Sequence, residues 1–181
     1  GAFLKWKGEL EPPPWKEMKK IAFVGSTIAL HWVTFYGSIK YSNVSIALSA
    51  LASTALFTAI LDPILSRTRP RAAELLLGLF IIFGIYLIFR FQQLYAVGIG
   101  LGLISAMLCA YFTIQTKGLL ENHGPRNLLF YELIGGFGTL TLLAPLYLYL
   151  FPAQNLLPNM ADSGYLLLLS IVCTVYAMQL S

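Results

Sequence analysis

Charged side chains are scarce in this chain. Only 11% of its 181 residues are Asp, Glu, Lys or Arg, 57% are hydrophobic, and the mean hydropathy is +0.73. Soluble domains carry roughly 25% charged residues. A water-exposed surface needs more polar groups than this chain can supply, so the composition excludes a soluble globular domain. It indicates an integral membrane protein, much of whose surface faces lipid.

Cysteines and catalytic motifs are equally scarce. Cys109 and Cys173 lie inside apolar runs without a Cys-x-x-Cys or Cys/His spacing, so we expect packing residues rather than a disulfide or a metal site. The chain has no Gly-x-Ser-x-Gly, His-Glu-x-x-His or P-loop motif, and no two carboxylates share a helix face at a catalytic spacing. These absences argue against an enzyme and predict neither a cofactor nor a metal.

Long apolar runs are what the chain has instead. A spanning helix needs about 20 apolar residues, and six segments approach that length. These predicted spans are Ile21–Ile39, Val44–Leu65, Ala73–Phe89, Leu94–Thr116, Leu128–Phe151 and Gly164–Ser181. The connections are short and rich in Pro, Gly, Asn and Ser, which favours antiparallel neighbours. The sequence therefore predicts an all-α membrane protein, folded as a multi-span helix bundle in a lipid bilayer.

Basic residues fall in short clusters between the apolar runs. They form no continuous stripe, which argues against a nucleic-acid partner. If the connection before Ile21 is cytoplasmic, alternate connections carry ten of the twelve basic residues, and the other side carries only Lys40 and Arg90. This bias follows the positive-inside rule and predicts both the six-span topology and its direction.

Small residues mark faces of the predicted helices. Gly98, Gly102, Ala106 and Ala110 recur every four residues, and Val44–Leu65 is rich in Ala and Ser. Helices in lipid pack closely through small residues, because the hydrophobic effect provides no driving force for helix association there. We expect packing faces, and the Ala- and Ser-rich segment is also compatible with the wall of a cavity.

Three ionisable residues, His31, Asp62 and Glu132, lie in or near predicted spans. Charge at membrane depth is costly, so each is a functional candidate. His31 has two interpretations. It is either a neutral side chain hydrogen-bonded to a neighbouring helix, or a cavity residue that binds substrate or exchanges a proton near neutral pH.

Glu132 follows the predicted helix start at Leu128 by four residues, about 6 Å at 1.5 Å per residue. We therefore expect an interfacial rather than a buried carboxylate, and we keep it as a candidate for the substrate cavity. Gly135, Gly136 and Gly138 follow directly. They would let another backbone approach closely or let the helix bend.

Asp62 and Pro63 combine a carboxylate with a helix-breaking residue. Proline removes a backbone donor and leaves the carbonyl near Ala59 without a partner, so the sequence predicts a kink or a loosened turn there. Arg67 follows five residues after Asp62 and offers the carboxylate an ionic partner. The pair is best interpreted as the end of a helix, with a role in gating.

Aromatic residues make up 14% of the chain. Those near predicted helix ends suit interfacial belts. Trp32, Tyr36, Tyr111 and Tyr176 lie deeper. Such rings either pack in a core or stack against an organic solute in a largely apolar cavity. Together with His31 and Glu132, they are the candidate residues of a substrate cavity.

The segment HWVTFYGSIKYSNVSIALSALASTALFTAILDPILSRTRPRAAELLLGLFIIFGIYLIF, from His31 to Phe89, resembles the EamA-type transporters of the drug/metabolite transporter superfamily. The resemblance rests on the order of its parts. These are Gly37–Tyr41, the small-residue helix Val44–Ala59, the pair Asp62-Pro63, the basic turn Arg67–Glu74 and the glycine-containing helix Gly78–Gly84. It covers Ile21–Phe89 and continues less specifically through Ser181. Only Asp62 and Pro63 are carried over from the family as a motif match.

The resemblance implies a ten-helix fold built from two inverted five-helix repeats around a substrate cavity. Residues 1–93 would run from the end of the second helix to the fifth, and residues 94–181 would hold the sixth to eighth helices. The chain would then be a fragment without the first and last helices.

The implied function is transport of small organic metabolites, of the amino-acid or drug/metabolite type, by alternating access. Export from a bacterial cell across its inner membrane is expected. A homodimer is left open. The alternatives are a membrane scaffold or binding protein without transport activity, and an intramembrane enzyme.

Overall fold

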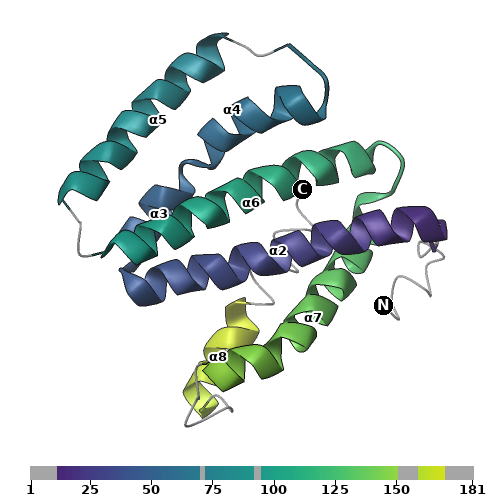
Figure 1. The fold of residues 1–181 in the computed structure, drawn as a ribbon. Coiled ribbons are helices and arrows are strands. Elements are labelled where there is room, and N and C mark those ends of the chain that lie inside the picture. Colours follow the sequence, from purple (N-terminus) through teal and green to yellow (C-terminus); the bar gives the residue numbers. More distant parts are fainter. Residues whose placement is uncertain (1–11, 70–71, 92–94, 151–158, 170–181) are drawn as a thin grey trace. The chain divides into compact units, whose positions relative to one another are not determined.

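A computed structural model describes residues 12–69, 72–91, 95–150 and 159–169 of the chain, which form helices and no strand (Figure 1). The helices are α2 (Trp15–Tyr41), α3 (Val44–Leu51), α4 (Thr54–Leu65), α5 (Ala72–Phe91), α6 (Ala96–Leu120), α7 (Pro125–Leu150) and α8 (Met160–Leu169). The predicted all-α fold is confirmed.

Three helical segments are long and apolar enough to cross a membrane. They are Val44–Leu65, Ala96–Leu120 and Pro125–Tyr149, and α5 contains a shorter apolar stretch, Leu76–Leu87. The predicted span Ile21–Ile39 lies within α2. Most of the predicted span Gly164–Ser181 falls outside the described residues. The chain is a multi-pass helical membrane protein.

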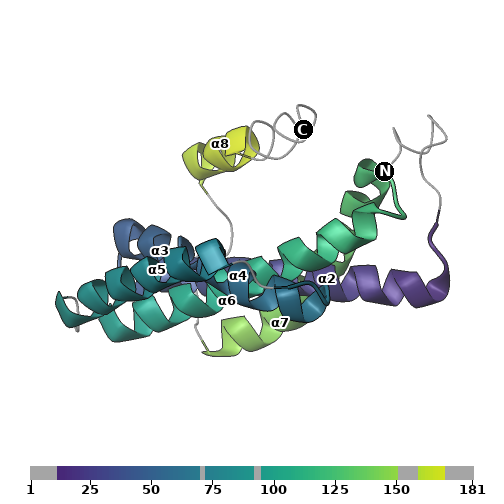
Figure 2. The ribbon, with the colours of Figure 1, turned by 90° about the horizontal axis from the view of Figure 1, so that it is seen from above.

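Two compact units divide the chain, Gly1–Leu142 and Leu143–Ser181. In the first unit, α6 packs against α2, α3 and α4, and α5 packs against α3 and α4. Figures 1 and 2 both show α6 running beside α2. The described part of the second unit consists of the end of α7 and the helix α8.

The small-residue face of α6 forms the centre of the first unit. Gly98, Gly102, Ala106 and Ala110 are all buried, so the predicted packing face is confirmed. A Cβ atom at Gly98 would lie 2.6 Å from the Cβ atom of Ser42, closer than packed carbon atoms approach. The hydroxyl group of Ser38 donates to the carbonyl oxygen of Gly98 at 2.6 Å. Small side chains thus bring α2 and α6 within hydrogen-bonding reach.

The span Val44–Leu65 is not one helix. It breaks at Ala52 and Ser53, between α3 and α4. The Thr54 hydroxyl group donates to the carbonyl oxygen of Leu51 at 2.6 Å, and the Ser53 N–H donates to Ala50 three residues back. These local bonds compete with the helical ladder. Pro63 lies inside α4, whose last residue is Leu65, so the kink or loosened turn expected at Pro63 stays a prediction.

Ser53 is fully buried, and its hydroxyl group has no hydrogen-bond partner among the described residues. Replacing it by alanine is expected to leave the free energy of unfolding unchanged or to raise it by about 1 kcal/mol, because an unsatisfied buried group costs about 1–3 kcal/mol. Ser38→Ala, at an equally buried position that donates a hydrogen bond, should lower it by about 1 kcal/mol. Thermal unfolding of the full-length protein in detergent measures both. Equal losses would contradict the unsatisfied state of Ser53.

The helices of the first unit run so that most of its basic residues gather at one end. The start of α2, the end of α4 and the α6–α7 connection lie together there (Figure 1). His123 Nε2 in that connection lies 2.9 Å from Glu17 Oε2 in α2. The described basic residues at this end are Lys16, Lys19, Lys20, Arg67, Arg69, Lys117 and Arg126. This clustering fits the charge bias on which the predicted orientation rests.

Candidate functional site

His31 lies inside the first unit and is only 5% exposed. Its Nδ1 atom lies 2.9 Å from both the carbonyl oxygen and the hydroxyl oxygen of Ser105 in α6. A carbonyl oxygen can only accept, so we assign the proton to Nδ1. The Ser105 hydroxyl group donates in turn to the carbonyl oxygen of His31 at 3.1 Å. Reciprocal hydrogen bonds thus join α2 to α6, as the first interpretation of His31 requires.

Aromatic rings enclose the imidazole of His31. The ring of Trp32 lies edge-on at 5.4 Å between centroids, and the ring of Phe112 in α6 lies edge-on at 5.5 Å. Phe35, one turn along α2, stacks on the imidazole at 6.2 Å. These contacts and hydrogen bonds fix the orientation of the side chain between the two helices.

Trp32 and Tyr36 form a stacked pair on the outer face of α2. Their ring centroids are 5.8 Å apart with an interplanar angle of 26°. The described residues leave them 47% and 55% exposed. Trp32 therefore connects an exposed aromatic surface to the buried imidazole of His31.

The structure does not bring the candidate tyrosine Tyr111 to this pair. Tyr111 in α6 accepts a hydrogen bond from Gln115 at 3.0 Å and meets α2 at Phe23. Phe23 precedes Trp32 by nine residues, about 13 Å along the helix. Tyr176 lies outside the described residues.

Glu132 is buried, with 4% of its surface exposed, and its Oε1 atom accepts a hydrogen bond from the Thr116 hydroxyl group at 2.8 Å. The expected interfacial position is wrong because the helix starts earlier than predicted. α7 begins at Pro125, so Glu132 lies seven residues into it, about 10 Å from its start. The carboxylate thus points into the contact between α7 and α6.

Glycines let α7 cross α2 at backbone distance. A Cβ atom at Gly25 would collide with the carbonyl oxygen of Glu132, and one at Gly135 would lie 2.7 Å from the carbonyl oxygen of Ala22. At Gly136 it would lie 3.0 Å from the carbonyl oxygen of Gly25. The predicted close approach at Gly135 and Gly136 is confirmed, whereas a Cβ atom at Gly138 would meet nothing within 4 Å.

The sequence prediction missed the α2 side of this crossing. The sequence feature that could have predicted it is a set of small residues spaced three and four apart, namely Ala22, Gly25, Ser26 and Ala29. The Thr139 hydroxyl group donates to the hydroxyl oxygen of Ser26 at 2.7 Å. A polar contact therefore accompanies the glycine contact between α2 and α7.

Asp62 is partly buried near the end of α4. The Ser66 hydroxyl group donates to its Oδ1 atom at 2.7 Å, and the Ser66 N–H donates to its carbonyl oxygen at 2.8 Å. Arg67 adopts a positive φ of 53°, a conformation that ends helices. The partner that the structure gives Asp62 is therefore Ser66, and the pair Asp62-Pro63 belongs to the C-terminal turn of a helix.

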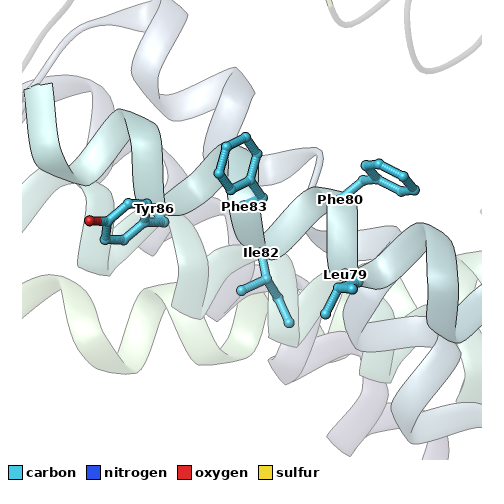
Figure 3. A pocket seen from close by; sticks show the side chains of 5 residues that line it. All are labelled: Leu79, Phe80, Ile82, Phe83 and Tyr86. Atoms are coloured by element: carbon cyan, nitrogen blue, oxygen red, sulfur yellow. The ribbon is translucent and has the colours of Figure 1, made fainter.

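Two hollows on the described surface are shallow, and neither of these two is lined by the candidate residues. The apolar one follows a single helix, α5, and Figure 3 shows its lining side chains, Leu79, Phe80, Ile82, Phe83 and Tyr86. The polar one lies at the basic end, beside the contact of Glu17 with His123. Within the described ranges, no three His, Cys, Asp or Glu side chains are grouped for a metal ion.

Residues 1–90 match the profile of the EamA-like transporter family. This range includes His31, Trp32, Tyr36, Asp62 and Pro63 and ends within α5. No curated protein and no solved structure matches the chain.

Proposed function

Because this chain belongs to the EamA-like transporter family, matched over residues 1–90, we propose that it carries a small organic solute across a membrane by alternating access. The family match is the observation that carries the proposal. The apolar helices support a lipid bilayer as the surroundings. We further propose export, from a bacterial cell across its inner membrane.

We propose the two inverted repeats at residues 1–93 and 94–181. On this division α2 belongs to the first repeat, whereas α6 and α7 belong to the second. The contacts of His31 with Ser105 and of Gly25 with Glu132 would then join the repeats. Since α6 also packs along α3 and α4, we infer that α6 moves with the first repeat during the transport cycle.

The stacked pair of Trp32 and Tyr36 is the proposed contact surface for the solute. Its exposed rings offer an apolar face, and the first ring contacts the polar side chain of His31. An organic solute binds most readily to such a combination of aromatic area and a few polar groups. Tyr111 and Tyr176 stay proposed cavity residues that await a test, as do the gating roles of Asp62 and Pro63.

Metabolite profiling tests the function directly. Cells with and without the full-length gene are compared for solutes in the cytoplasm and in the medium, and liposomes that contain the purified protein are then tested with each solute that differs. Accumulation of one solute inside the cells without the gene supports export. If no solute differs and liposomes carry none of a broad metabolite mixture, a scaffold or binding protein is favoured.

Trp32→Ala is expected to lower transport of the solute so identified by at least tenfold, because it removes half of the stacked pair. Trp15→Ala is the matched control, since it removes another exposed tryptophan of α2 that suits an interfacial belt. Initial rates of uptake into liposomes measure both variants. Equal rates for the wild type and Trp32→Ala would remove Trp32 from the proposed surface.

A further inference from the structure

Glu132 is a carboxyl group buried within a membrane-spanning segment, Pro125–Tyr149. Only 4% of its surface is exposed, and the hydrogen-bond partner of its side chain is the hydroxyl group of Thr116. A hydroxyl group stabilises a carboxylate by one hydrogen bond but supplies no charge. An ionised Glu132 would therefore need a countercharge from a neighbouring group.

Neither neighbouring helix offers a cation to this carboxyl group in the described structure. The residues of α2 that meet α7 here are Ala22, Gly25, Ser26 and Ala29. On α6, Thr116 and Leu119 face α7, the latter packing with Leu128. Lys117 is exposed, and Arg126 lies nearly two turns before Glu132 and is also exposed. The other titratable group nearby, Tyr131, packs at the edge of the apolar cluster.

His31 is too distant to share a proton with Glu132. Its partner Ser105 and the partner of Glu132, Thr116, are both on α6. They are eleven residues apart, which is about 16 Å along the helix. The two intramembrane groups are therefore separate sites. The imidazole is held by Ser105 and three rings, whereas the carboxyl group has a single polar partner.

An unpaired carboxylate in a dry interior is strongly disfavoured, and a buried acid takes up a proton instead. From the burial, the single hydroxyl partner and the absence of a facing cation, we propose that Glu132 is the proton-binding site of this transporter. The proton is bound while α7 is packed on α2 and α6. This proposal rests on the transport function proposed above.

The backbone of Glu132 couples this proton to helix movement. Its carbonyl oxygen is the atom against which Gly25 packs, so the carboxyl group lies directly at the α2–α7 crossing. When the crossing opens, water reaches the carboxyl group. The O–H bond of the acid then breaks, the proton passes to a water molecule, and the carboxylate remains. Closure requires the reverse step, in which hydronium returns the proton.

Infrared difference spectroscopy of the full-length protein in lipid tests the site without a known solute. Spectra are recorded over a pH series for the wild type and for Glu132→Gln. We expect a carbonyl stretching band of a protonated carboxyl group that disappears as the pH rises and that Glu132→Gln lacks. Glu121→Gln is the matched control, because it removes an exposed carboxylate at the end of α6. It should leave the band unchanged.

A folded Glu132→Gln protein that keeps the complete band would overturn the proposal. Should this variant fail to fold, Thr116→Val retains the acid and removes its hydrogen-bond donor. The band is then expected at the same intensity but at a higher frequency, and an unchanged frequency would also overturn the proposal. If the band is absent but metabolite profiling still identifies a solute, the proton site fails and the transport function stands.

Discussion

Gly25→Ala is expected to separate α2 from α7 and to lower the thermal stability of the protein sharply. The new Cβ atom would collide with the carbonyl oxygen of Glu132 and lie 3.0 Å from the backbone nitrogen of Gly136. Backbone atoms cannot turn aside as a flexible side chain does, so one helix must shift. Overpacking costs about 1–3 kcal/mol, and more where rigid groups meet.

Gly138→Ala is the matched control, because this glycine belongs to α7 itself and a Cβ atom there would meet nothing within 4 Å. Alanine is favoured over glycine within a helix by about 1 kcal/mol, so the control should be neutral or slightly stabilising. Thermal unfolding of the full-length variants in detergent measures the difference. Equal melting temperatures for Gly25→Ala and Gly138→Ala would show that the two helices do not cross at backbone distance.

The helices themselves could be predicted because a bilayer imposes simple demands on a sequence. The predicted span Leu94–Thr116 corresponds to α6, Ala96–Leu120, since uninterrupted apolar residues of this number satisfy their backbone groups only as a helix. The repeat of Gly98, Gly102, Ala106 and Ala110 likewise predicted a packed face, because residues four apart share one side of a helix.

The predictions failed where local hydrogen bonds or helix starts decided the outcome. The break at Ala52 and Ser53 depends on whether the Thr54 hydroxyl group reaches the carbonyl oxygen of Leu51, a choice that composition does not reveal. Glu132 was expected at an interface because Pro125 was assigned to a loop. Proline is favoured at the first position of a helix, so Gly124-Pro125 was a usable start signal.

The setting of His31 could not be read from the sequence for a different reason. Its partner Ser105 is 74 residues away, and many hydroxyl groups in the chain were possible partners. The depth of His31 in an apolar run identified it as significant but left two interpretations. The pairing of His31 with Ser105 is set by how α2 packs on α6. That packing depends on the register between the two helices, which neither segment specifies alone.

His31→Ala is expected to lower the free energy of unfolding by about 2–4 kcal/mol, since it opens a cavity among three aromatic rings and removes a buried hydrogen bond. Ser105→Ala should cost about 1 kcal/mol. The double variant should lose less than the sum of the two, by about 0.6 kcal/mol and at most about 1.7 kcal/mol, the mean and the maximum measured for hydrogen bonds between membrane helices. Strict additivity would contradict the contact between Nδ1 and the Ser105 hydroxyl oxygen, since the two bonds to backbone carbonyl oxygens each survive substitution of the partner.

Trp32→Ala provides the contrast, because it changes the neighbouring residue, whose side chain is 47% exposed. We expect Trp32→Ala to reduce the transport rate while changing the melting temperature little. For His31→Ala we expect the main effect to be a lower melting temperature. The reverse pattern, with a stable His31→Ala protein that no longer transports, would assign His31 to the solute rather than to the α2–α6 contact. Unfolding curves and transport rates on the same preparations therefore separate a residue that joins helices from one that contacts the solute.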